Sequence, residues 1–285
     1  MKVYIFSGLF FLLNIAFFGQ DKRVVKDSLT QEVIPFASIF LENSKKSFTS
    51  DENGNFQISN PDIEDKISFS AVGYLKKTIQ IKNQSIILLK PITYELEEVA
   101  VSNDVKRKTL EIGLTKDKYL QAFENGAKYE VKYFPYFPIY KKTNFIKTVT
   151  FHSENKLEKA KFKVHFYAVD ENGLPGKTLL DRDCIVAVKQ GARKTSFNIS
   201  YLNLEMPIKG IFVAFEKLVI ESNKFEKKNQ NGTTGQTNYQ PNIFYSSVEK
   251  TAQFKYNNGK WSQKRNPDNS SLIFNEPAIY LTLTN

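Results

Sequence analysis

Cysteine and histidine are nearly absent from this chain of 285 residues, which holds one Cys and two His. A single cysteine excludes an internal disulfide. Two histidines, neither in an HExxH arrangement, are too few for the three protein ligands that a catalytic zinc normally takes. The sequence also has no GxSxG nucleophile elbow, GxxxxGK[ST] phosphate loop or GxGxxG dinucleotide fingerprint. Enzyme is therefore the minority hypothesis, and we predict no cofactor and no metal site.

The cysteine and the two histidines lie in stretches whose pattern of residues predicts β-strands. Cys184 stands in DRDCIVAVK, which alternates and then becomes apolar as a buried strand does. We expect a small buried side chain there, because a reactive thiol needs an electropositive, partly exposed setting. His152 and His165 fall opposite the apolar positions of their strands, so both are expected on the solvent side.

The first 20 residues, MKVYIFSGLFFLLNIAFFGQ, are typical of a secretory signal peptide, with one Lys, an apolar run and a small residue near the junction. A transmembrane helix is the alternative, but the run is short for one and is broken by polar residues. We expect cleavage near Gly19 or Gln20 and no integral membrane span afterwards. No Cys stands at the junction to carry a lipid anchor. The expected location is the periplasm or the outer membrane of a Gram-negative envelope.

The basic excess of the chain lies in its second half. Residues 21–100 carry ten Lys and Arg against twelve Asp and Glu, a net charge of −2, whereas 101–285 carry 29 against 18, a net charge of +11. In an exported protein this favours an anionic glycan or lipopolysaccharide and no nucleic acid as partner. The simpler alternative, which we favour, is a Lys-rich solvated surface that keeps the protein soluble.

Short strands separated by turn residues fill the region from 22 to 90, which is typical of a small antiparallel sandwich. In FASIFLE, the residues Ala37, Ile39 and Leu41 make one apolar face that we expect in the core. The order VVKD, EVIPFASIFLENS, TSDENGNFQI, ISFSAVGY, IILLK and ELEEVAV resembles the carboxypeptidase-like regulatory domain over residues 22–101. The resemblance implies a transthyretin-like sandwich, as found ahead of TonB-dependent transporters, and a non-catalytic accessory role.

The rest of the chain predicts a linker and a second sandwich. Residues 91–127 form the linker, with a short helix from the N-cap Thr115 to Gly126. Eight candidate strands over 128–285 suit a larger, basic, jelly-roll-like sandwich, with a hairpin at Asn258-Gly259. The stretch 221–242 has almost no core-forming residues and predicts a long loop. The predicted fold class is therefore all-β with two β-sandwich domains, and the boundaries are 1–20, 21–90, 91–127 and 128–285.

The tetrapeptide DENG occurs twice, at 51–54 and at 170–173. A calcium loop of the EF-hand kind needs oxygen ligands at alternate positions and Gly at the sixth, and neither copy has this spacing. An Asn-Gly pair between strands needs only a tight turn, because both residues accept positive φ. We predict turns at Asn53-Gly54 and Asn172-Gly173.

The candidate binding residues are three aromatic residues and two lysines. KYEVKYFPYFPIYKK, residues 128–142, places Tyr133 and Tyr136 near Lys141 and Lys142, a pattern that suits stacking on sugar rings beside an acidic group, and Trp261 is a further candidate. The alternative, which we favour, is an edge strand whose prolines confine it to that position and whose rings seal a core.

The function that this sequence predicts is a non-catalytic exported binding or adaptor protein, linked to outer-membrane transport or surface assembly. Its expected partner is an envelope protein or an anionic glycan. The alternative is a hydrolase of envelope polymers with its site in the second domain. Its carboxylates would come from Asp181, Asp183 or Glu216, and the separation of such carboxylates sets the mechanism.

Overall fold

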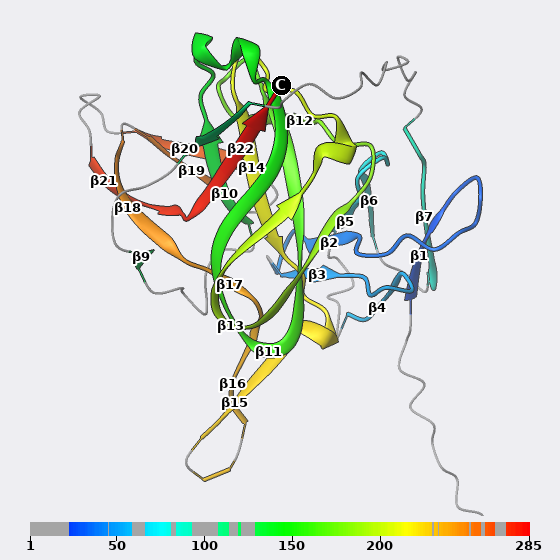
Figure 1. Cartoon of the computed structure of the whole chain (residues 1–285). Coiled ribbons are helices and arrows are strands. Elements are labelled where there is room, and N and C mark those ends of the chain that lie inside the picture. The colour runs from blue at the N-terminus through cyan, green and yellow to red at the C-terminus, as the bar shows by residue number, and fades with distance from the viewer. Residues whose placement is uncertain are drawn as a thin grey trace, which may run out of the picture.

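A computed structural model of the chain shows, in the part that it describes, β-strands and three short 3-10 helices (Figure 1). The described residues are 23–44, 46–58, 66–80, 84–92, 108–113, 119–120, 129–229, 231–232, 234–250, 252–257, 260–265 and 272–285. Within these ranges, no helix has the length and apolar character needed to cross a membrane. The predicted signal peptide, residues 1–20, lies outside them. The all-β fold class is confirmed.

The N-terminal part folds into two small sheets, in the orders β4-β1-β7 and β3-β2-β5-β6. All pairs are antiparallel except β1 with β7, which is parallel. The strands are β1 (Arg23–Asp27), β2 (Ser38–Leu41), β3 (Ser47–Thr49), β4 (Asn55–Phe56), β5 (Lys66–Ser70), β6 (Lys77–Gln80) and β7 (Ile86–Leu89).

Alternation along these strands creates the first hydrophobic core. Ala37, Ile39 and Leu41 are buried, as predicted, and they pack with Phe69 of β5 and Leu89 of β7. Side chains on alternate positions of a strand point to opposite faces, so the other face of β2 and β5 is free to meet the rest of the molecule.

The larger part centres on an eight-stranded sheet with the order β10-β14-β11-β22-β8. The long strand β11 runs over 25 residues, and β12, β13 and β17 pair with it outside this order. The strands are β8 (Thr109–Ile112), β10 (Tyr129–Phe134), β11 (Phe145–Val169), β12 (Pro175–Thr178), β13 (Cys184–Asn198), β14 (Ile211–Lys217), β17 (Asn242–Ile243) and β22 (Ile279–Thr284).

The second hydrophobic core lies on the inner face of this sheet. Phe162, Val164 and Phe166 of β11 are buried there, together with Phe151 and Phe215. The rings of Phe151 and Phe215 lie 4.8 Å apart. The division into domains at 21–90, 91–127 and 128–285 stays a prediction, and the structure adds that β8, from within the predicted linker, pairs with β22.

The remaining strands form a small sheet and two hairpins outside the large sheet. The sheet has the order β21-β18-β9, and the hairpins pair β15 with β16 and β19 with β20. Their bounds are β9 (Tyr119–Leu120), β15 (Lys224–Lys228), β16 (Thr234–Tyr239), β18 (Tyr245–Lys250), β19 (Ala252–Asn257), β20 (Lys260–Arg265) and β21 (Leu272–Pro277). The 3-10 helices are η1 (Pro138–Lys142), η2 (Ser200–Leu202) and η3 (Glu221–Asn223).

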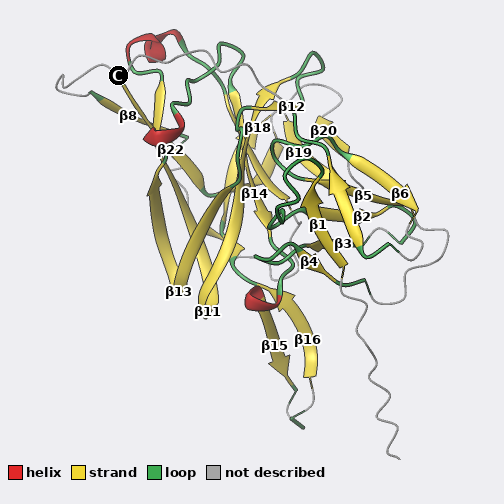
Figure 2. Ribbon diagram, turned by 90° about the vertical axis from the view of Figure 1, so that its right-hand side faces the viewer, coloured by secondary structure: helices red, strands yellow, loops and turns green. Residues whose placement is uncertain are grey.

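Two expectations about these outer segments are wrong. The predicted loop 221–242 contains the hairpin β15–β16, which projects from the body of the molecule (Figure 2). Most side chains of β15 are exposed, so the strand carries no alternating apolar pattern to signal it. Within the predicted helix from Thr115 to Gly126, residues 119–120 instead pair with the open edge of β18, and its other residues lie outside the described ranges.

Both DENG stretches are tight turns, as predicted. Gly54 and Gly173 have φ of +72° and +74°, in the left-handed region that favours glycine. The carboxylate of Asp51 accepts the backbone N–H groups of Asn53 and Asn55, each at 2.8 Å. Asp170 holds its own turn in the same way. These two carboxylates therefore bind the backbone of the turn. The hairpin predicted at 258–259 is supported by the pairing of β19 with β20 on either side, and its two turn residues lie outside the described ranges.

The outer face of the N-terminal sheet packs against the large sheet. Phe36 lies in an apolar cluster with Leu218 and Ile220. The carbonyl oxygen of Phe36 accepts the buried Lys163 ammonium at 2.5 Å, and the hydroxyl of Ser38 donates to Glu216 at 2.5 Å. The N-terminal strands therefore lie beside the large sheet as Figures 1 and 2 show.

Candidate functional site

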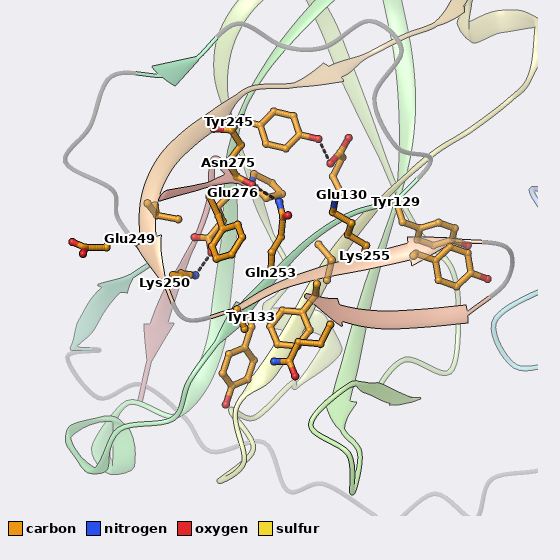
Figure 3. Close-up of a pocket in the computed structure, with 18 of the residues that line it drawn as sticks. Tyr129, Glu130, Tyr133, Tyr245, Glu249, Lys250, Gln253, Lys255, Asn275 and Glu276 are labelled. Carbon is orange, nitrogen blue, oxygen red and sulfur yellow. Dashed lines mark hydrogen bonds and ion pairs between the residues drawn. The ribbon is translucent and has the colours of Figure 1, made fainter. Parts of the chain in front are cut away.

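A cavity of about 740 Å³ lies between the edge of the large sheet and the C-terminal strands (Figure 3). Its walls come from β10, β18, β19 and β21. This volume falls within the range of small-molecule sites, ~300–1,000 Å³. We call this cavity the aromatic pocket; the residues that define it below are Tyr129, Glu130, Tyr133, Tyr245, Gln253, Tyr256 and Glu276.

The aromatic wall arises because the hairpin β19–β20 covers the outer face of the large sheet. Tyr129 of β10 contacts Tyr256 of β19, with ring centroids 4.4 Å apart. Phe254 of β19 lies 4.8 Å from Phe212 of β14, and Tyr133 lies 4.9 Å from the same ring. Such edge and tilted pairs add stability beyond the area that they bury. The rings are therefore held in place before any ligand binds.

Glu130 and Tyr245 form the polar end of the aromatic pocket, where the tyrosine hydroxyl donates to the carboxylate. Burial raises the pKa of Glu130 to about 7, although the bond from Tyr245 and the charge of Lys217 act to lower it. Burial and the neighbouring carboxylate also raise the pKa of Tyr245 above its ordinary value. Glu130 is therefore partly protonated at neutral pH, and it can donate or accept a hydrogen bond.

Lys250 and Glu276, on the opposite side of the aromatic pocket, form an ion-pair group with Lys132, which lines an adjoining cavity. The Lys132 ammonium lies 2.8 Å from one oxygen of Glu276 and donates to the carbonyl of Gly113 at 2.7 Å, while Lys250 contacts the second oxygen of Glu276. Burial lowers the pKa of both lysines to about 8. The raised pKa of Glu130 and the lowered pKa of Lys250 belong to groups of one cavity, and perturbed titrations gathered in this way are a feature of functional sites.

The predicted binding residues divide between two places. Tyr133 lines the aromatic pocket, and its hydroxyl donates to the carbonyl of Lys209 at 2.9 Å. Trp261 packs 4.7 Å from Tyr256 and lines a neighbouring cavity.

The other three predicted residues do not line the aromatic pocket. The strand ends before Pro135, and the chain turns into η1, where Lys141 and Lys142 are exposed. Tyr136 packs against the core of the large sheet and contacts Tyr140 at 5.9 Å. As the favoured interpretation of this stretch expects, β10 forms one end of the strand order and its rings pack against hydrophobic clusters, although both prolines follow the strand.

Sequence reasoning missed the polar residues of the aromatic pocket. Glu130 comes from β10, whereas Tyr245, Lys250, Gln253 and Glu276 come from β18, β19 and β21, more than 100 residues further along the chain. No spacing rule joins them, because the pairing of β18 with β21 and the packing of these strands and β19 against β10 bring them together. Glu130 carried one signal, an acidic residue inside the most aromatic stretch of the sequence.

The three carboxylates of the hydrolase hypothesis are already engaged outside the aromatic pocket. Asp181 pairs with Arg182 at 3.1 Å, and Asp183 pairs with the buried Lys163 at 3.0 Å. Glu216 is fully buried and is bound by Ser38 at 2.5 Å. The carboxylates that line the aromatic pocket are Glu130, Glu249 and Glu276.

The expectation that both histidines face solvent is wrong for His165. This residue is 6% exposed, and its Nε2 lies 2.8 Å from Glu216. The N-terminal sheet covers this face of β11. The side chains that point away from the large core, such as Lys163 and His165, are therefore buried as well. The hydroxyl of Ser38 and the imidazole both contact the carboxylate, whereas a nucleophilic triad needs the imidazole between the two. His152 is half-buried and contacts Tyr280.

Cys184 is buried in the large core, as predicted. Burial raises the pKa of its thiol above the ordinary value, which makes the thiolate scarce at neutral pH. In the described part of the chain, no group of three or more His, Cys, Asp and Glu side chains is placed to hold a metal ion.

Comparison with known proteins places one domain. Residues 24–101 match the family described as the CarboxypepD_reg-like domain, which confirms the resemblance predicted from the sequence. This kind of domain is regulatory and non-catalytic, which is compatible with a role other than catalysis. A comparison with curated protein sequences gives no match.

Two solved structures of infectious bursal disease virus cover 92% of this chain, one of the Gx strain and one of the VP2 subviral particle. Both are 11% identical to it, with TM-scores of 0.27 and 0.26. The chain spans 55% and 54% of their lengths.

Proposed function

We propose that this protein is an exported, non-catalytic binding protein of the Gram-negative envelope that holds a glycan in the aromatic pocket. The observation that carries the proposal is the composition of the pocket, with a fixed ring wall formed by Tyr129, Tyr133 and Tyr256 facing polar side chains. A sugar ring has apolar C–H faces and a hydroxylated edge, so it fits between such walls. Hydroxyl groups need donors and acceptors together, which carboxylates, amides and tyrosines supply.

Charge on the pocket walls favours a sugar unit without a strong charge. Lys250 is paired with Glu276, and Glu130 is close to half-protonated at neutral pH. Acidic units of the same glycan would instead face the lysines outside the pocket, in line with the net charge of +11 over 101–285. We therefore expect a mixed or neutral glycan to bind more tightly than a fully acidic one.

Export and a role in outer-membrane transport or surface assembly are part of this proposal. They rest on the predicted signal peptide and on the CarboxypepD_reg-like domain. Fractionation of the native host, with the N-terminus of the purified protein determined by mass spectrometry, tests them. A cytoplasmic protein that keeps residues 1–20 would contradict them.

A glycan array followed by isothermal titration tests the ligand. Tyr133→Ala removes a ring from the pocket wall and is expected to weaken binding at least about tenfold, because the lost apolar area, at ~25 cal/mol per Å², adds to the ~0.5–1.5 kcal/mol of the ring contacts themselves. Tyr133→Phe keeps the ring and should bind like the wild type. The matched control is Tyr201→Ala, an exposed ring on η2. Equal loss in Tyr133→Ala and Tyr201→Ala would contradict the proposal.

The second candidate function is a glycan hydrolase that uses Glu130 as general acid. The observation that favours it is the pKa of about 7, which suits proton donation at neutral pH. Mass spectrometry of the bound glycan after long incubation distinguishes the two. Intact glycan supports the binding protein, and cleavage that Glu130→Gln abolishes supports the hydrolase.

A further inference from the structure

A second cavity, of about 290 Å³, lies between the N-terminal sheet and the large sheet. One wall is the outer face of β2, β3 and β5, where Ser38, Ser47, Ser68 and Ser70 line it. Ser38 and Ser70 are direct partners across β2 and β5. This wall therefore carries a row of hydroxyl groups, of which Ser38 is bonded to Glu216 and Ser68 to Glu42 and Thr78. We call this space the interdomain cavity.

The opposite wall of the interdomain cavity is aromatic. Trp261 lies 5.7 Å from Tyr167 and 4.7 Å from Tyr256, and all three rings line the cavity. The buried side chains of His165 and Lys163 also line it, but they are bonded to Glu216 and Asp183. The interdomain cavity thus repeats the chemistry of the aromatic pocket, with rings on one side and hydrogen-bonding groups on the other.

The two cavities meet at Tyr129 and Tyr256, which line both. Strand β19 connects them, since Ala252, Gln253 and Phe254 line only the aromatic pocket and Tyr256, near its end, lines both. Figure 3 shows Tyr129 at one end of the aromatic pocket and Glu249 at the other. A ligand extended along β19 would reach from one cavity to the other across the shared rings of Tyr129 and Tyr256.

We propose that the ligand is a chain of linked sugar units, of which some occupy the aromatic pocket and others the interdomain cavity. This inference rests on the proposed function and adds the size of the ligand. It also gives the CarboxypepD_reg-like domain a direct part in binding, because its serines form one wall. Lys76, exposed at the same cavity, is placed to meet an acidic unit.

The test measures affinity against chain length for maltooligosaccharides, chitooligosaccharides and oligogalacturonides, from the disaccharide upward. In the wild type we expect the affinity of the best series to rise at least about tenfold between the disaccharide and longer fragments. Ser70→Arg fills the interdomain cavity from an exposed position and should remove that gain while leaving disaccharide affinity unchanged. Ser44→Arg, on the turn after β2, is the matched control and should keep the gain.

Fluorescence of Trp261, the single tryptophan, gives an independent readout. Longer fragments should change its emission, and Ser70→Arg should abolish the change. Disaccharide binding with no gain for longer fragments, or an equal loss of disaccharide affinity in Ser70→Arg, would overturn this inference and leave the proposed function in place. No binding of any sugar series would overturn both.

Discussion

Replacing Glu130 by glutamine tests the electrostatics of the aromatic pocket most sharply. The pKa of this buried carboxyl is raised from an ordinary 4.5 to about 7. A raised acid pKa means that the folded protein favours the protonated form. The contribution of the Glu130 carboxyl to the free energy of unfolding is therefore fully present below about pH 4.5 and is lost as pH rises through about 7. Glutamine has the shape of the protonated acid and carries no charge, so Glu130→Gln should avoid that loss.

The size of the effect follows from the shift. The rise in the pKa of Glu130 from 4.5 to about 7, at 1.36 kcal/mol per unit, corresponds to about 3 kcal/mol. This is the upper value for the gain in unfolding free energy of Glu130→Gln over the wild type at high pH. Urea unfolding at about pH 5 and about pH 9 measures it, and the titration of Lys132 and Lys250 cancels in the difference between variant and wild type. The control is Glu249→Gln, an exposed carboxyl on the same pocket. A difference between Glu130→Gln and wild type that stays constant from pH 5 to pH 9 would refute the reasoning.

Three further predictions concern the fold around the site. Gly173→Ala should lower the free energy of unfolding by about 1 kcal/mol, because its φ is positive. Gly54→Ala should lower it by at least about 2 kcal/mol, because the new Cβ would also lie 2.8 Å from the carbonyl oxygen of Val25. Equal losses in urea unfolding would contradict this prediction. The hydrogen bond from Ser38 to Glu216 joins the N-terminal sheet to the large sheet. A double-mutant cycle of Ser38→Ala and Glu216→Gln, measured by urea unfolding, should give a coupling energy of about 1–3 kcal/mol. A value near zero would show that the contact does not form. Cys184 should react with a thiol reagent only on unfolding, and rapid labelling of the native protein would contradict its burial.

The fold could be predicted where one face of a strand meets a core. Ala37, Ile39 and Leu41 follow this rule, and so do Phe162 and Val164 in the large sheet. The rule fails on β11, where His165 and Lys163 occupy the opposite face and are also buried. An alternating pattern predicts which face of a strand is apolar, but it does not predict whether a second sheet will cover the polar face.

The candidate site could be predicted only in part for the same reason. Tyr133 and Trp261 were found because aromatic residues stand out in a sequence. Glu130, Lys250 and Glu276 were missed because their proximity arises from pairing between β10 and β14 and between β18 and β21, together with the packing of these elements. Their altered pKa values follow from burial, which no local pattern encodes.

Isothermal titration of Tyr133→Ala beside Tyr201→Ala, with the glycan that binds best on the array, tests the central claim most directly. The account predicts saturable binding to the wild type, unchanged binding to Tyr201→Ala, and at least about tenfold weaker binding to Tyr133→Ala. Binding that is unaffected by loss of the Tyr133 ring would place the ligand outside the aromatic pocket and contradict the account.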